Sequence, residues 1–158
     1  MTRTTHSRPY NSIANDGITT ETLQTCLVHL LTVGLLAKHA HWNVVGPNFR
    51  SIHLQLDELA DFARTGADGV AERIATVGAH PDGRPGTISE LNTMPTVELG
   101  SMREASAAKS MVATLDVAIE QLQTAADMTA DADPISQGLL IDITAALEKH
   151  AWLLRAQI

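Results

Sequence analysis

The sequence predicts an all-α protein, a bundle of four long helices with one long crossover connection. Its 158 residues lie within the usual size of one domain. Aromatic residues make up only 3% of the chain whereas alanine and leucine are abundant, which favours helices packed on helices over a β-sandwich. We therefore expect a flexible N-terminal tail at residues 1–15, followed by a single four-helix-bundle domain at 16–158.

The first two helices are expected to form an antiparallel hairpin. Thr19 or Thr20 can cap a first helix that runs to about Val45. The triplet at residues 46–48 (Gly-Pro-Asn) ends it, and its asparagine can cap a second helix that runs to Gly78. The apolar residues of the first helix recur at three- and four-residue steps, at Leu23, Leu27, Leu30, Leu31 and Leu35.

A long crossover follows the hairpin. From His80 to Gly100 the chain holds too many prolines and glycines for a long element, although residues 87–91 can form one or two helical turns. We therefore expect an extended connection that carries a short helix.

The last two helices form a second hairpin. The third helix is expected from about Ser101 to Met128, on its apolar spacing. Asp133 and Pro134 are a helix cap and a first-turn proline, and they open a fourth helix that runs to the C-terminus. Two hairpins joined by one long crossover is the wiring of a ferritin-like four-helix bundle.

Charge and cysteine content argue against several classes of protein. The formal net charge of −7 is opposite in sign to what a phosphate backbone attracts. Cys26 is the only cysteine, so no intrachain disulfide can form and a cytoplasmic location is expected. The first ten residues are polar, unlike a secretory signal, and we expect no segment to reach the ~18 apolar residues needed to span a bilayer. We therefore expect no membrane partner.

One face of the second predicted helix carries side chains typical of metal ligands. At about 100° per residue, His53, Asp57, Asp68 and Glu72 lie well away from the helix's apolar stripe. His53 and Asp57 are four residues apart, as are Asp68 and Glu72, so each pair can offer two ligands to one ion. Asp57 and Asp68, however, lie about 16 Å apart along the helix axis, which is too far for ligands of one ion.

One chain therefore cannot complete this site. If two copies of the helix pack antiparallel about a two-fold axis near residues 62 and 63, His53 and Asp57 of one copy meet Asp68 and Glu72 of the other, twice. His41 joins the first half-site, because it lies opposite His53 in the hairpin. Two imidazoles and three carboxylates suit Fe(II), and also Mn(II) or Zn(II). Three more residues on this face are interpreted as salt-bridging partners at the interface or a solvated rim: Arg50, Asp61 and Arg64.

The run from Lys38 to Phe49 resembles the Dps family of ferritin-like miniferritins. The resemblance continues through residues 53, 56–58, 68 and 71–73, and returns in the fourth helix at 133–134, 139–140 and 147–152. It implies a homododecamer of tetrahedral symmetry, built through two-fold and three-fold interfaces. Each two-fold interface would hold two ferroxidase centres.

The resemblance also implies an activity. Fe(II) is oxidised at dinuclear or partly occupied centres, preferentially by hydrogen peroxide, and ferric mineral is stored inside the shell, which protects DNA from oxidative damage. Trp42 resembles the family tryptophan that gives an electron to a stray oxidant, with simple packing as the alternative. The iron ligands carried over from the family are His41, His53 and Asp57 from one subunit and Asp68 and Glu72 from its mate.

Two other functions fit the same residues. The interface ligands could hold Zn(II) in a hydrolase that attacks an amide or ester, with a carboxylate such as Glu72 as the base. The third candidate is a DNA-compacting structural protein. The tail has only Arg3, Arg8 and His6 as basic residues, so we expect direct DNA binding to be weak or absent.

Acidic residues near the start of the fourth helix line the iron pore in the resembling family. Gly138 stands where an aspartate is common, so Asp131, Asp133 and Asp142 are the candidates to replace it. For Asp133 we favour helix capping over a role in the pore.

Overall fold

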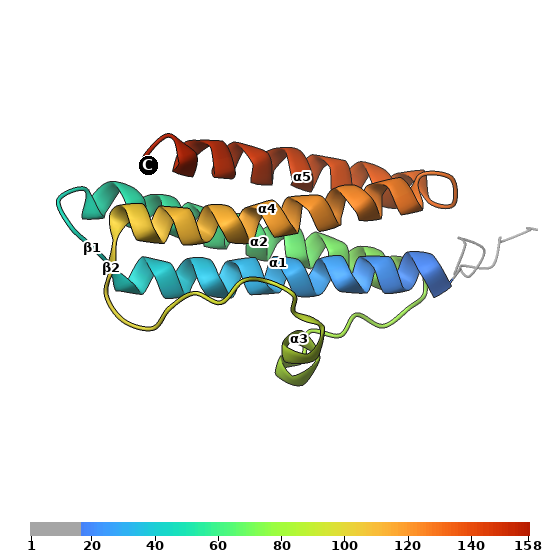
Figure 1. Cartoon of the computed structure of the whole chain (residues 1–158). Helices are drawn as coiled ribbons and strands as arrows, with labels where there is room; N and C mark the ends of the chain where they lie inside the picture. The colour runs from blue at the N-terminus through green and yellow to red at the C-terminus, as the bar shows by residue number, and fades with distance from the viewer. Residues whose placement is uncertain (1–16) are drawn as a thin grey trace, which may run out of the picture.

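The computed structural model of the chain describes residues 17–158 and confirms the all-α four-helix bundle. Helices α1 (Gly17–Asn43) and α2 (Phe49–Thr76) form one hairpin, and α4 (Glu104–Thr129) and α5 (Pro134–Arg155) form the other. The four long helices lie side by side (Figure 1). The tail expected at residues 1–15, with Arg3, His6 and Arg8, lies outside the described residues.

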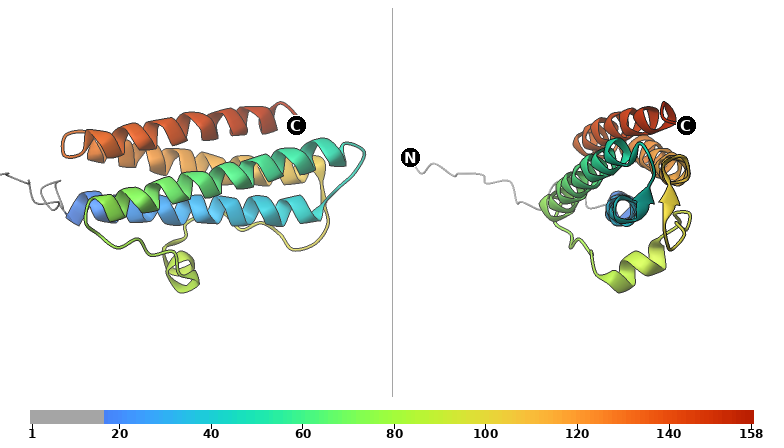
Figure 2. Two further views of the ribbon diagram at one scale, coloured as in Figure 1. Left: turned by 180° about the vertical axis from the view of Figure 1, so that it is seen from behind. Right: turned by 90° about the vertical axis from the view of Figure 1, so that its left-hand side faces the viewer.

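The crossover contains the expected short helix, α3 (Pro85–Leu91), which stands off the bundle beside α1 (Figure 2). At the end of the crossover lies the two-residue strand β2 (Met102–Arg103). It pairs in parallel with β1 (Val44–Val45), the strand that directly follows α1. Such short strands carry no sequence periodicity, and we did not predict them. Three side chains of α1 hydrogen-bond the crossover: Gln24 to Asp82, His29 to Thr93 and His39 to Glu98.

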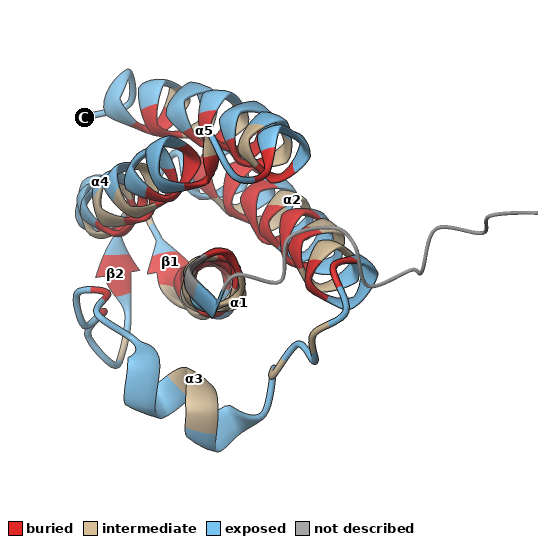
Figure 3. Cartoon of the chain, turned by 90° about the vertical axis from the view of Figure 1, so that its right-hand side faces the viewer, coloured by how far each residue is buried: buried red, intermediate tan, exposed pale blue. Residues whose placement is uncertain are grey.

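The core lies where the buried stripes of the four long helices meet (Figure 3). On α2 the buried stripe includes Ile52, Leu56, Leu59, Ala63, Val70 and Ile74, which recur at helical spacing. Between residues 17 and 158, α1 is the one helix long and apolar enough to cross a membrane, with a mean hydropathy of 1.2. This corrects our expectation that no segment would reach that level. Half of its apolar window is buried in the bundle, as in a core helix.

The helix starts agree with the sequence to different degrees. Asp133 caps α5 as predicted, because its carboxylate accepts a hydrogen bond from the Ser136 N–H at 3.2 Å. The prediction for α1 is wrong, since the helix begins at Gly17 and Thr19 and Thr20 lie inside it. Asn48 precedes α2 as predicted, but its side chain makes no capping bond.

Candidate metal centre

His41 and His53 lie face to face near the α1–α2 turn. Their ring centroids are 3.6 Å apart, and the ring planes meet at 20°. The Nδ1 atom of His41 lies 2.8 Å from the His53 carbonyl oxygen, and Nδ1 of His53 lies 2.9 Å from the His41 carbonyl oxygen. A carbonyl only accepts hydrogen bonds, so Nδ1 is the donor in each ring, and Nε2 is the atom of each imidazole that is left to bind a metal ion. Metal-ligating histidines in proteins are held in this way.

The turn between the helices sets this alignment. Gly46 has a φ of +139°, a conformation that favours glycine, and its carbonyl accepts a hydrogen bond from the Phe49 N–H at 3.1 Å. Glu104, at the start of α4, packs against the turn and accepts a hydrogen bond from the Asn48 N–H at 2.7 Å. The second hairpin thus satisfies the N–H of the residue that precedes α2, as the carboxylate of a capping box does, and ties the turn to α4.

Asp57 lies one helical turn beyond His53 and forms an ion pair with Lys38 of α1. The hydrogen bond from Lys38 holds the pKa of Asp57 below its usual range despite partial desolvation, and the charges of Lys38, His41 and His53 act in the same direction. Sequence reasoning did not single out Lys38 as a functional residue. The signal was available, because the hairpin register that puts position 41 opposite 53 also puts 38 next to 57.

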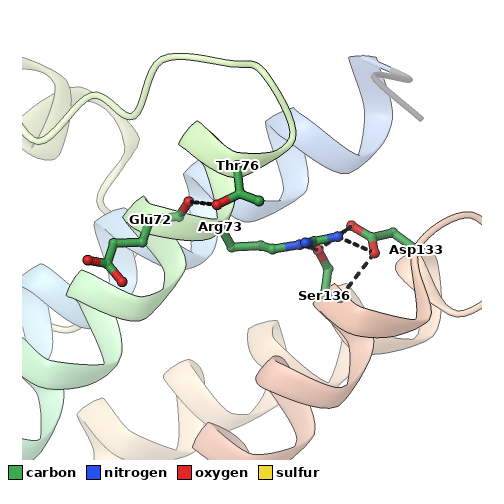
Figure 4. Close-up of polar contacts among 5 residues, drawn as sticks. All are labelled: Glu72, Arg73, Thr76, Asp133 and Ser136. Atoms are coloured by element: carbon green, nitrogen blue, oxygen red, sulfur yellow. Dashed lines mark hydrogen bonds and ion pairs between the residues drawn. The ribbon is translucent and has the colours of Figure 1, made fainter. Parts of the chain in front are cut away.

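Asp68 and Glu72 are exposed and lie further along α2. The Glu72 carboxylate points away from α5, whereas neighbouring Arg73 reaches toward it (Figure 4). Asp68 lines a hollow of about 510 Å³ between α1, α2 and the crossover.

The described part of the chain does not gather these side chains into one cluster. Among residues 17–158, no three His, Cys, Asp or Glu side chains are placed to hold a metal ion together. The structure brings His41, His53 and Asp57 near one another at the turn, and leaves Asp68 and Glu72 about 16 Å away along α2. Trp42 lies beside His41 in sequence and is 71% exposed.

Asp133 belongs to a different arrangement. Its carboxylate accepts hydrogen bonds from Arg73 at 2.7 and 2.8 Å, and its side chain is only 4% exposed (Figure 4). Burial raises the pKa of Asp133, but the hydrogen bonds from Arg73 and Ser136 outweigh burial and lower it overall. Asp133 therefore joins α2 to α5 and is not free to line a pore, whereas Asp131 and Asp142 are exposed.

Comparisons with known proteins agree with this architecture. A family model for the ferritin-like domain matches residues 20–158. The fine tangled pili major subunit of Haemophilus ducreyi is 36% identical over 97% of this chain and 81% of its own length. The DNA protection during starvation protein of Mycolicibacterium smegmatis is 39% identical over 78% of this chain and 68% of its own length. The structure of Dps from Microbacterium arborescens in its high iron form is 32% identical and superposes with a TM-score of 0.85, covering 89% of this chain and 92% of that one.

Proposed function

The chain belongs to the Dps family of ferritin-like proteins, and on that premise we propose that it is a ferroxidase and iron-storage protein that protects DNA from oxidative damage. The centres would be shared between subunits at two-fold interfaces of a cytoplasmic homododecamer. Iron is the substrate and the stored cargo. Two or fewer ions would occupy each centre, and Zn(II) or Mn(II) could compete for it.

The paired histidines are the observation that carries this proposal. Their Nδ1 atoms are engaged by backbone carbonyls at 2.8 and 2.9 Å, which leaves both Nε2 lone pairs for a metal ion without further rearrangement of the tautomers. Asp57 adds a carboxylate beside them. Asp68 and Glu72 of a second copy would complete a mixed nitrogen and oxygen set, which suits Fe(II).

The reaction needs an electron acceptor, for which we propose hydrogen peroxide. Each of two ferrous ions gives up one electron, and one peroxide molecule accepts both electrons and two protons to form two water molecules. The carboxylates Asp57, Asp68 and Glu72 stabilise the higher charge of the ferric product. Removing Fe(II) and peroxide together suppresses hydroxyl-radical formation.

Trp42 would give an electron to an oxidant that escapes the centre. It directly follows His41 in the sequence, and the residue is 71% exposed in one chain. A Trp42→Phe variant should assemble normally and lose the tryptophan radical that electron paramagnetic resonance detects in the wild type after iron and peroxide are mixed. An unchanged radical signal would assign Trp42 to packing.

The proposal is tested by stopped-flow oxidation of Fe(II) with peroxide. We expect the His53→Ala and Asp68→Ala variants each to lose most of the rapid oxidation, while His80→Ala, which alters an exposed histidine outside the centre, stays at the wild-type rate. Light scattering on the same samples should show particles of about twelve subunits. Rapid oxidation that survives in both ligand variants would contradict the proposed centre.

The other two functions give different outcomes. Zn-dependent cleavage of an amide or ester that is lost in Glu72→Gln would favour the hydrolase. DNA binding that disappears when residues 1–10 are deleted would favour the DNA-compacting protein, and its strength should fall steeply with salt. We expect that binding to be weak or absent.

A further inference from the structure

Two further charged residues, Asp61 and Arg64, lie on the α2 face that carries the proposed ligands. Asp61 and Arg64 lie between Asp57 and Asp68 and, at about 100° per residue, on the same side of the helix. Their side chains are each 70% exposed, and their charged atoms are 3.8 Å apart within one chain. An ion pair this long and this exposed contributes little, so both charges are available to a partner.

Three pairs of positions on α2, namely 53 and 72, 57 and 68, and 61 and 64, are symmetric about the same point of the helix. Each pair lies symmetrically about the point between residues 62 and 63, so a two-fold axis at that point brings each member opposite the other member of its pair in a second copy. The register that completes the proposed metal centres therefore also brings Arg64 of each copy opposite Asp61 of the other. The three pairs are His53 with Glu72, Asp57 with Asp68, and Asp61 with Arg64.

The surroundings of Arg64 call for a carboxylate partner. Arg64 and Leu31 line both of two hollows, of about 510 and 690 Å³, along this side of the molecule. The larger one also exposes the apolar side chain of Leu35, which is 61% accessible. A second copy that covers this apolar face would remove water from the guanidinium, and a buried charge is costly unless it is paired.

We propose that Asp61 and Arg64 form reciprocal ion pairs with a second copy of this chain across the two-fold axis, and so favour the register in which the two half-sites meet. This inference rests on the proposed function, in which two copies of the chain share each metal centre. Asp61 and Arg64 are positioning residues, since they act through the alignment of the two α2 helices and not on the metal.

Two single variants test the pairing. Arg64→Glu leaves both positions acidic, and Asp61→Arg leaves both basic, so in either variant like charges face each other across the axis. We expect association across the two-fold axis to weaken about 100-fold in each variant alone. Sedimentation without metal, over a range of protein concentrations at which the assembly dissociates, measures this change. An equimolar mixture should recover to within about tenfold of the wild type, because the acidic chain then faces the basic one.

Mixing the two variants distinguishes an ion pair formed between two chains from an ion pair formed within one chain. If Asp61 and Arg64 acted only within a chain, mixing would restore nothing, because each variant still lacks its own opposite charge. Wild-type association of either single variant, or absence of recovery on mixing, would overturn the inference. Circular dichroism should show both variants fully helical, since the two positions are exposed. Arg50→Glu is the matched charge-reversal control on the same face. In this register position 50 faces the uncharged Ala75, which assigns Arg50 to the solvated rim, so this variant should associate like the wild type.

Cobalt binding provides a second readout. The visible absorption of Co(II) reports the ligand set directly, and we expect it to be lost in each variant and to return in the mixture. Recovery of association without the cobalt spectrum would overturn the assigned register. A wild-type protein that assembles but does not oxidise iron would overturn the proposed function and leave the mixing result intact.

Discussion

Lys38 of α1 forms an ion pair with Asp57 of α2, so an ammonium group binds one of the carboxylates expected to hold iron. A metal ion that uses Asp57 must displace this ammonium or share the carboxylate with it. The ion pair therefore makes the part of the centre that depends on Asp57 weaker than the part that depends on His41 and His53.

Replacing Lys38 by glutamine should therefore strengthen binding at that weaker position. We expect Lys38→Gln to tighten the second ion bound per centre by about tenfold, because a competing cation and its hydrogen bond are removed. Calorimetric titration with Zn(II) under oxygen-free conditions measures the change. Lys149→Gln, which alters an exposed lysine of α5, serves as the control. Identical isotherms for Lys38→Gln and the wild type would show that the ammonium does not compete.

Asp133→Asn should destabilise the bundle. The substitution leaves the Arg73 guanidinium, whose side chain is only 10% exposed, without its charged partner. Breaking a buried pair in this way costs about 3 kcal/mol. Urea unfolding measures the loss, with Asp131→Asn as the exposed control that should stay within about 0.5 kcal/mol of the wild type. A small effect at both positions would show that Arg73 and Asp133 do not act as a tie between α2 and α5.

The same carboxylate predicts a dependence of stability on pH. The folded state lowers the pKa of Asp133 below its unfolded value of about 3.9, so its stabilisation is complete above that pH and is lost as the pH falls through the folded pKa. The difference in unfolding free energy between wild type and Asp133→Asn should therefore narrow below about pH 4. Melting temperatures from pH 7 to pH 3 test this, and a constant difference would contradict it.

Local signals in the sequence were sufficient for most of the fold. Asp133 and Pro134 identify the start of α5 because a cap and a first-turn proline act within one helical turn. The apolar stripe of α2 likewise follows from helical spacing alone. The start of α1 was misplaced because Thr19 and Thr20 are typical caps in composition, while the helix extends to Gly17.

The parts that could not be predicted depend on contacts distant in sequence. Glu104 caps the turn before α2 across 56 positions, and Arg73 meets Asp133 across 60. Neither pair has a periodic signature. For the candidate centre, helix geometry supplied the ligand faces and the separation between half-sites, whereas the contact of Lys38 with Asp57, which the hairpin register also implies, was not predicted.

Gly46 offers a test of how strictly the turn controls the centre. A Cβ atom at this position would overlap the Glu104 carboxylate, and the φ of +139° is strained for any residue with a side chain. We expect Gly46→Ala to lower the free energy of unfolding by about 1–3 kcal/mol. Displacement of Glu104 also removes the cap on the Asn48 N–H and loosens the register of His41 and His53, so Zn(II) affinity should fall as well. Gly86→Ala is the control, because a Cβ atom there meets nothing within 4 Å. Lower stability with unchanged Zn(II) affinity would mean that the histidine pair is held by its own mutual hydrogen bonds and not by the turn.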